Sequence, residues 1–460
     1  MALLSKMLAL KPSVGRCMLV AGLMLAAMAA PARAETLAEA LSSALASNTK
    51  IAIADLDAQV AAVGIDIASA GYRPNITADL TGSASATSFG TTQVQLRGGF
   101  EFRQMLFDSF LTDANVAVAE AEATGMAHQS AGTRQQVLLA VVRGYYGLVR
   151  DRAMLDLAER NVANIADVLR GTEEAATRGD ATRIEVSQAL ARLAQSKGQL
   201  ELARQRVVLS TWVYTELVGH APGRLTDGLG GRISAMPLSL EDAINEASQS
   251  NPFVQSALSG VSAAIARVDV AKAQFGPKLN LTASVCALTC FGIPSTSDVS
   301  GTVALHLTVP LYSGGAEHAT VQRANLERQR AEVQLAAAFD ATDTEVITAW
   351  AALESNRQAI VAARAVAAAS REVLDGLARA HQLGEATTIE LLNASADVIG
   401  AEQSALAAQA ELVVAQYGLL AAVGRLDMGD DQDTPDAAPA ELLPVSEDVG
   451  PADPWTDLRG

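Results

Sequence analysis

Two carboxylates stand at equivalent places in a pair of similar segments. Residues 179–189 read GDATRIEVSQA and residues 384–394 read GEATTIELLNA, which places Glu185 and Glu390 205 positions apart. At a narrow passage such carboxylates would attract cations and repel anions, whereas on ordinary helices they would only be solvated. The sequence has no nucleophile elbow, Walker motif, zinc-ligand spacing or dinucleotide fingerprint. We therefore expect no enzyme, no cofactor and no metal site, and an effect of these side chains through their charge.

The two segments also predict tight turns between helices. Gly179 and Gly384 can each end a helix by adopting a positive φ, and Thr182 and Thr387 can cap the helix that follows. We therefore expect each carboxylate to lie at the start of a helix, just beyond a turn.

The whole chain consists of two repeats, of which these segments are one part. Leu37-Ala38-Glu39-Ala40 answers Leu240-Glu241-Asp242-Ala243 at an offset of 203, and Leu106-Phe107 answers Leu311-Tyr312 at 205. Each half is predicted to contain a helical segment (about 37–71 and 240–274), two strands, a very long helix and a second helix. The first repeat is expected over 35–236, with a β-hairpin about 74–105 and a helical tip about 178–186. The second is expected over 237–426, with a hairpin about 277–311 and a tip about 383–391.

The two ends of the chain lie outside the repeats. Residues 1–34 carry basic residues, an apolar run and Ala32-Arg33-Ala34, which predicts a signal peptide cleaved between Ala34 and Glu35. Its removal, with four basic and no acidic residues, changes the formal net charge from −17 to −21. So acidic a chain is a poor partner for nucleic acid. Residues 427–460 hold ten acidic residues and five prolines, and predict a disordered, solvated tail.

Alternating polarity predicts the strands. In 93–103, 278–285 and 300–309, apolar residues alternate with polar ones, so each strand has one apolar face. A soluble sheet would bury that face against other elements, whereas a transmembrane barrel would turn it to lipid, which strands of about ten residues in an exported chain favour. Four strands cannot close a barrel, since membrane barrels need about eight or more. The chain must then pool its strands with other copies, because an open sheet edge in lipid is too costly.

Two very long helices are predicted over 111–177 and 317–383, where no proline occurs. About 65 helical residues would span roughly 100 Å. Such helices are stable only when packed lengthwise, as in coiled coils. We therefore expect an extended helical body joined to a barrel.

Taken together, these features resemble the TolC family of outer-membrane efflux and secretion channels. The resemblance covers about 35–426 and is carried by the order of elements and by Gly-x-x-x-x-Ile-Glu-(Val/Leu)-x-x-Ala in each repeat. The junction Leu311-Tyr312-Ser313-Gly314-Gly315 is also similar to the family's, although its counterpart Leu106-Phe107-Asp108-Ser109 lacks the glycines.

The resemblance implies a mainly α fold with a transmembrane β-barrel, in which each repeat contributes a two-strand hairpin and long antiparallel coiled-coil helices. Three chains would form a homotrimer with a 12-stranded barrel in outer-membrane lipid and an α-helical tunnel through the periplasm. The implied partners are a periplasmic adaptor protein and an inner-membrane ABC or proton-driven transporter. The implied function is the exit duct of a tripartite efflux or type I secretion system, which exports small molecules or proteins.

The resemblance also implies roles for several residues near the tips. Glu390 occupies the position of an aspartate that rings the periplasmic entrance, and Asn393 that of a second such aspartate. His381 replaces a tyrosine, and Ala386 an arginine, that help to hold the closed state. We hypothesise that Glu185 pairs with His381 when the histidine is protonated, which would make the gate pH-sensitive.

Two further sets of residues are candidate contacts. The turn residues would contact the adaptor or, equally, only form the turns: Gly179, Asp180, Ala181, Gly384, Glu385 and Ala386. The polar strand residues would face the barrel lumen or be partly paired with one another: Arg97, Glu101, Arg103, Lys278 and His306.

Some alternatives stay open at this level. A periplasmic coiled-coil adaptor or scaffold without its own pore is the alternative class of protein. Cys286 and Cys290 either form a disulfide in a loop or are free thiols, since cysteines four residues apart in a strand are too distant to bridge. No cysteine follows the cleavage position, which favours the secretion or general-purpose branch of the family over its lipidated drug-efflux branch.

Overall fold

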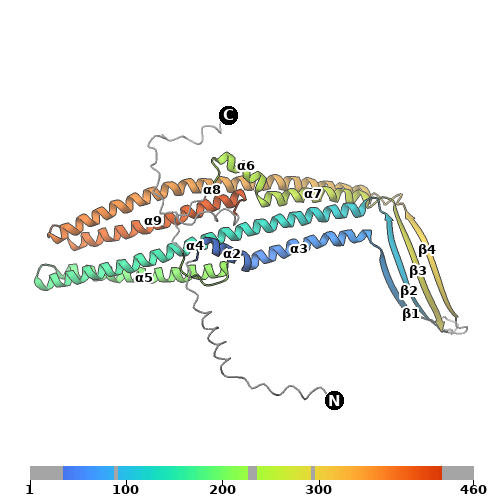
Figure 1. Ribbon diagram of the computed structural model, residues 1–460, viewed down its shortest axis with the longest axis horizontal. Coiled ribbons are helices and arrows are strands. Elements are labelled where there is room, and N and C mark those ends of the chain that lie inside the picture. The colour runs from blue at the N-terminus through green and yellow to red at the C-terminus, as the bar shows by residue number, and fades with distance from the viewer. Residues whose placement is uncertain (1–34, 87–91, 226–235, 292–295, 427–460) are drawn as a thin grey trace, which may run out of the picture.

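The molecule is elongated, with a bundle of long helices at one end and a β-sheet at the other (Figure 1). The computed structural model describes residues 35–86, 92–225, 236–291 and 296–426. The predicted signal peptide, Ala34 and the predicted acidic tail lie outside the described residues.

The helices follow the predicted order in each half of the chain. In the first half they are α2 (Leu37–Ser47), α3 (Thr49–Ser69), the short 3-10 helix η1 (Ala70–Tyr72), α4 (Leu111–Arg178) and α5 (Arg183–Val218). In the second half they are α6 (Leu240–Ser250), α7 (Pro252–Ala273), α8 (Ala316–Gln382) and α9 (Thr388–Val423). α4 has 68 residues and α8 has 67, so the prediction of two very long helices is confirmed.

The first helical segment of each repeat is broken in two, which the sequence analysis did not predict. The breaks fall at Asn48 and Asn251, whose backbones are extended and whose side chains cap the following helix. Each asparagine also donates a hydrogen bond from its side-chain amide across the bundle, Asn48 to the Leu217 carbonyl and Asn251 to the Ala422 carbonyl. The break therefore fastens the short helices α2 and α6 to the ends of α5 and α9.

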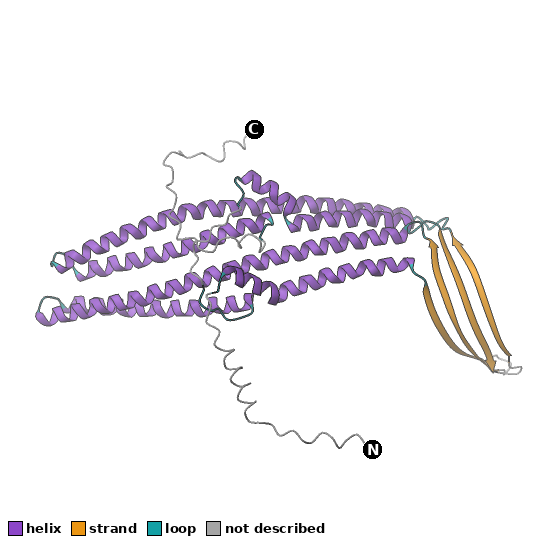
Figure 2. Cartoon of the chain, viewed as in Figure 1, coloured by secondary structure: helices purple, strands orange, loops and turns teal. Residues whose placement is uncertain are grey.

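One antiparallel sheet combines the hairpins of both repeats, in the order β1-β2-β3-β4. The strands are β1 (Asn75–Ala86), β2 (Thr92–Phe107), β3 (Lys278–Phe291) and β4 (Thr296–Thr308). They have 12 to 16 residues, somewhat more than the predicted ten, and extend beyond the helices (Figure 2).

The register gives this sheet one polar and one apolar face. Residues directly opposite in neighbouring strands point to the same side, and Arg103 is opposite both Asn75 and Thr282. On the other side Phe100 is opposite Ala78 and Val285. Large side chains of this apolar face are strongly exposed: Ile76, Leu80, Phe100, Val303, Leu305 and Leu307. The alternation is therefore confirmed for the segments in which it was predicted, 93–103, 278–285 and 300–309, and the apolar face is left uncovered within the described chain.

The helices lie side by side along the long axis of the molecule. Near the sheet, neighbouring helices follow the order α3, α4, α7, α8; toward the tips, the order is α5, α4, α9, α8. α3 and α5 therefore lie on one edge of the bundle and α8 on the other. α9 is, by length and composition, apolar enough to cross a membrane, but it packs against α8 and α4 within this bundle.

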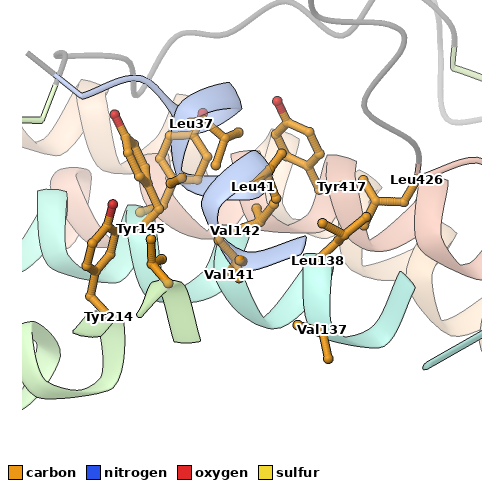
Figure 3. Packing of buried hydrophobic residues seen from close by; sticks show 14 of the residues in the cluster. Leu37, Leu41, Val137, Leu138, Val141, Val142, Tyr145, Tyr214, Tyr417 and Leu426 are labelled. Atoms are coloured by element: carbon orange, nitrogen blue, oxygen red, sulfur yellow. The ribbon is translucent and has the colours of Figure 1, made fainter. Parts of the chain in front are cut away.

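The main core lies at mid-length, where α2 and the ends of α5 and α9 meet α4. Figure 3 shows Leu37, Val141 and Tyr145 packed there together with Tyr214 and Tyr417. Val141, Val142 and Leu148 are completely buried, and burial of each such side chain contributes about 1.5–3 kcal/mol. This core fixes the middle of the molecule, so the tips are positioned by the long helices that extend from it.

Candidate functional site

Both predicted turns are formed, at the end of the bundle farthest from the sheet (Figure 1). Gly179 and Gly384 have φ of 89° and 79°. A Cβ built on either glycine would meet no atom within 4 Å, so the left-handed backbone, and not lack of space, is the reason for glycine there. The prediction that these glycines end the helices through a positive φ is confirmed.

The two predicted gate carboxylates belong to capping boxes. The Thr182 backbone N–H donates to Glu185 Oε2 at 2.6 Å, and the Glu185 N–H donates to Thr182 Oγ1 at 3.3 Å. The second tip has the same pair, with 2.8 Å from Thr387 N to Glu390 Oε2 and 3.4 Å from Glu390 N to Thr387 Oγ1. The threonine caps were predicted from the sequence, whereas the reciprocal role of the glutamates was not, although Thr-x-x-Glu is the sequence signal of a capping box.

These hydrogen bonds also fix the charge of the glutamates. The backbone N–H and side-chain hydroxyl of Thr182 lower the pKa of Glu185, and the same groups of Thr387 lower the pKa of Glu390. Hydrogen bonds to the ionised form favour that form. Glu185 and Glu390 are therefore held ionised, each in the first turn of a helix, where the N-terminus also favours negative charge.

His381 lies in the last turn of α8, and its Nδ1 is 2.9 Å from the carbonyl oxygen of Ala386 in the second tip. His381 contributes an electrostatic lowering of the Glu185 pKa, which is smaller than the effect of Thr182. Among the contacts described at the tips, the Glu185 carboxylate is bonded to Thr182 and His381 faces Ala386, so the two side chains do not form an ion pair with each other. The predicted pair would thus require a movement of one side chain.

Asn393 has a partner that the sequence analysis missed. Arg192 Nη2, on α5, donates to Asn393 Oδ1, on α9, over 2.6 Å. Beside this bond, Leu392 packs with Ile165, Leu169 and Ala189 of the helical hairpin α4–α5. A sequence signal existed, since Arg192 follows Glu185 by two helical turns and therefore lies on the same helix face.

The candidate adaptor-contact residues occupy the outermost turns. Gly179, Asp180, Gly384 and Glu385 are exposed, whereas Ala181 and Ala386 are half-buried. The Asp180 carboxylate is 3.4 Å from Arg178 Nε. Each turn therefore presents one exposed acidic residue, Asp180 in the first and Glu385 in the second, and Asp180 is paired with Arg178.

The polar strand residues share one face of the sheet. The register places Arg97, Glu101, Arg103, Lys278 and His306 on the same side. Arg103 and Glu101 are paired at 2.7 Å, which agrees with the alternative that these polar residues are partly paired with one another.

Cys286 and Cys290 lie in β3 on this same polar face. Both are free thiols, so the alternative of a loop disulfide is wrong, because β3 continues through both positions and holds them apart. Arg97 Nε lies 3.0 Å from Cys286 Sγ.

Glu35, the residue expected after cleavage, is anchored in the middle of the bundle. Its carboxylate accepts a hydrogen bond from the Tyr214 hydroxyl at 2.5 Å, and its carbonyl accepts one from the Tyr145 hydroxyl at 3.0 Å. Its N–H donates to the Arg224 carbonyl at 2.6 Å. Burial, followed by this contact with Glu35, raises the pKa of Tyr214. The start of the described chain is therefore fixed to the end of the first repeat.

An open amphipathic sheet, long paired helices and charged tips at the far end define a channel protein of the outer membrane. The chain belongs to the outer membrane efflux protein family, whose model matches residues 40–212 and 243–425. It is thus a non-enzymatic efflux or secretion channel of the TolC family, as the resemblance predicted. This family assignment decides against the alternative of a scaffold without its own pore.

Individual relatives agree with the family match. The chain is similar to the outer membrane efflux protein BepC of Brucella suis, with 29% identity over 422 residues that cover 91% of each chain. It is also 29% identical to protein CyaE of Bordetella pertussis, over 81% of this chain and 80% of the relative. Among solved structures, CusC matches with a TM-score of 0.75 at 18% identity, over 84% of this chain and 92% of that one. The last likeness shows the fold.

Proposed function

We propose that three copies of this chain form one continuous exit duct, with a 12-stranded barrel in the outer membrane and a helical tunnel in the periplasm. The observation that carries this proposal is the open sheet, in which β1 and β4 each have a neighbour on one side only within the described chain. In lipid every backbone N–H and C=O needs a hydrogen-bond partner. Pairing β4 of one copy with β1 of the next satisfies both edges, and three copies supply enough strands to close a barrel.

The outer helices of the bundle support the same assembly. α3 carries a row of apolar side chains, each more than half exposed, at heptad spacing: Ile53, Leu56, Val60, Val63 and Ile67. On the opposite edge, Leu326 and Val333 of α8 are also exposed and are seven residues apart. Such rows are the seams along which helices pack in coiled coils. In the proposed trimer, α3 of one copy covers α8 of its neighbour.

The tips form the periplasmic mouth of this duct. Glu390 and Asn393 of three copies surround the entrance. His381 stands beside them in the same helical hairpin, α8–α9, and Glu185 stands in the neighbouring helical hairpin, α4–α5. The exposed turn residues around Asp180 and Glu385 contact the periplasmic adaptor. Support for these roles comes from the ionised, capped glutamates and from the place of both turns at the end opposite the sheet.

The duct works with an adaptor and an energised inner-membrane transporter, of the ABC or proton-driven kind. The channel itself supplies a passage and no chemical energy. Cargo, whether small molecules or proteins, is selected mainly by the inner-membrane partner. Family membership supports this division of labour, since efflux and secretion channels share one fold.

Cross-linking of the strand edges tests the assembly. Cys286 and Cys290 are first replaced by serine. Each variant then receives one cysteine in β1 and one in β4, at polar-face positions such as Thr77 and Thr302. We expect oxidation to link separate chains into species of two and three chain masses in outer-membrane extracts. A β1–β2 pair, Thr77→Cys with Glu101→Cys, is the matched control, because these residues are opposite within one chain. Exclusively single-chain products from every β1–β4 pair would overturn the proposal.

A further inference from the structure

The hydrogen bond from Arg192 to Asn393 joins the two helical hairpins, α4–α5 and α8–α9, near their tips. It measures 2.6 Å, and a second guanidinium nitrogen of Arg192 donates to Gln195 at 3.2 Å on the same helix. Asn393 lies one helical turn beyond Glu390. The bond therefore connects the first-repeat helix α5 to the part of α9 where the entrance carboxylate sits.

The bond itself is exposed, but the residues beside it are packed. Arg192 is half-buried, and Leu392 beside Asn393 is buried in the apolar cluster with Ile165 and Ala189. A cavity of about 230 Å³ separates α5 from α9 here, lined by Gln188, Ala191, Arg192, Gln195, Ile389 and Leu392. Any widening that moves α5 away from α9 must break the bond at the rim of this cavity.

The charge of the pair is not balanced. A guanidinium keeps its positive charge at physiological pH, and the Asn393 amide that accepts its hydrogen bond is neutral. Two N–H groups of the Arg192 guanidinium are donated to Asn393 and Gln195, and the remaining ones are available for a carboxylate or phosphate. An acid at position 393 would have neutralised this charge. The tip thus carries a cation that is bonded to α9 one helical turn beyond Glu390.

We propose that Arg192 is a specificity-determining residue of the entrance, which holds the two hairpins together in the narrow state and gives the mouth a positive site for anionic groups of cargo. The inference rests on the proposed function, because it needs the tips to surround the passage. It predicts a mouth of mixed charge, with a ring of Glu390 carboxylates beside a ring of Arg192 guanidinium groups.

Channel recordings of the full-length protein in planar lipid bilayers test this role. In Arg192→Gln the hydrogen bond to Asn393 weakens and the positive charge is lost. We therefore expect a higher conductance and a K⁺/Cl⁻ permeability ratio raised about two- to fivefold, the size expected for an exposed charged contact. Asn393→Asp should raise the permeability ratio as well but lower the conductance, because the hydrogen bond becomes an ion pair. Arg204→Gln is the matched control: Arg204 is also on α5 but pairs with Glu201 and Glu159 within its own hairpin.

The outcomes separate this inference from the proposed function. Wild-type protein that forms no channels would reject the proposed function itself. Wild-type channels whose conductance and permeability ratio are unchanged in Arg192→Gln would overturn the role of Arg192, provided the variant migrates as the same oligomer. An equal effect of Arg204→Gln would overturn it too, because any loss of α5 charge would then suffice. Should Arg192→Gln fail to assemble, Asn393→Asp decides alone, with an unchanged permeability ratio as the contrary result.

Discussion

The Ser109 hydroxyl donates a hydrogen bond to the Pro277 carbonyl oxygen over 2.7 Å. Ser109 lies between β2 and α4, and Pro277 immediately precedes β3. The bond therefore ties the start of the first long helix to the start of the second hairpin. The Asp108 carboxylate strengthens the same junction, since it accepts hydrogen bonds from the backbone N–H groups of Leu111 at 3.1 Å and Thr112 at 2.8 Å.

The backbone of this junction is left-handed without glycine. Ser109 and Phe110 have φ of 60° and 65°, and their second-repeat counterparts Gly314 and Gly315 have 64° and 82°. Loss of the glycines from the first repeat has therefore kept the shape of the turn, at a cost of roughly 1–2 kcal/mol per residue. The hydrogen bonds of Ser109 and Asp108 offset part of that cost.

Substitution of Phe110 measures the strain. Phe110→Ala and Phe110→Gly both lose the edge-to-face contact with Phe107, but only glycine relieves the positive φ. We expect the glycine variant to be the more stable by about 1 kcal/mol in denaturant unfolding of the detergent-solubilised protein. Gly315→Ala is the converse control and should destabilise the protein by about 1 kcal/mol. A Cβ at position 315 meets no atom within 4 Å, so the loss would come from the positive φ alone. Equal midpoints for the two Phe110 variants would show that the turn is unstrained.

The capping boxes predict a loss of order at the tips in acid. The pKa values of Glu185 and Glu390 are lowered by Thr182 and Thr387. A carboxyl group with a lowered folded pKa contributes stability above its unfolded value of about 4.3, and that contribution disappears as the pH falls through the folded value. Amide exchange, corrected for its intrinsic rate, should thus show constant protection in the first turns of α5 and α9 above about pH 5 and a decline below about pH 4.

Glutamine variants provide the comparison for this experiment. Glu185→Gln and Glu390→Gln should each remove the pH dependence at their own tip, because the amide does not titrate. Glu173→Gln, at an exposed position of α4, should leave both tips unchanged. Parallel pH curves for wild type and both tip variants would argue against the capping account.

The anchor of Glu35 predicts the effect of removing one hydroxyl. Tyr214→Phe leaves the Glu35 carboxylate without its 2.5 Å donor, and we expect a loss of about 1.5–3 kcal/mol in unfolding free energy. Because the folded pKa of Tyr214 is raised, this stability is fully present below the unfolded value of about 10 and is lost as the pH rises through the folded value. The difference between the two proteins should therefore be constant from about pH 7 to 9. Tyr312→Phe, at an exposed tyrosine, is the control; a cost as large as that of Tyr214→Phe would contradict the assignment.

The free cysteines predict which face of the sheet meets water. Cys286 and Cys290 share the face of Arg97 and Arg103, which the proposed barrel turns to its lumen. A charged, water-soluble thiol reagent should modify both cysteines in membranes and lower the channel conductance. Val285→Cys, in a protein whose native cysteines are replaced by serine, places the thiol on the apolar face and should react slowly. Faster reaction at position 285 would mean that the faces are assigned the wrong way round.

The fold was largely predictable because its signals are periodic and repeated. The long helices extend without proline, and the strands alternate strictly, so α4 and α8 begin and end within a residue or two of the expected places. The breaks at Asn48 and Asn251 were missed because each depends on a carbonyl from a distant helix, Leu217 or Ala422. Local pattern alone does not show such a partner.

The candidate site was predictable only in part, for the same reason. The turns and their glycines follow from local conformation, and the capping boxes were readable from Thr-x-x-Glu. The contact of Arg192 with Asn393 depends on which faces of α5 and α9 meet, which is decided by the packing of Leu392 among residues of the first hairpin. The carboxylates are therefore visible in a single segment of the sequence, whereas the contact of Arg192 with the other helical hairpin is not.

His381, in the last turn of α8, allows a test of whether the entrance responds to pH. In the present geometry His381 faces the Ala386 carbonyl and Glu185 caps α5. A protonated His381 would attract the Glu185 carboxylate and link the end of α8 to the helical hairpin α4–α5, so we expect wild-type conductance in bilayers to be lower at about pH 5 than at about pH 8. His381→Ala should give a flat curve, and His318→Ala, an exposed histidine at the opposite end of α8, should behave as wild type. Identical curves for wild type and His381→Ala would reject a histidine switch and leave both residues with only their local roles in the turns.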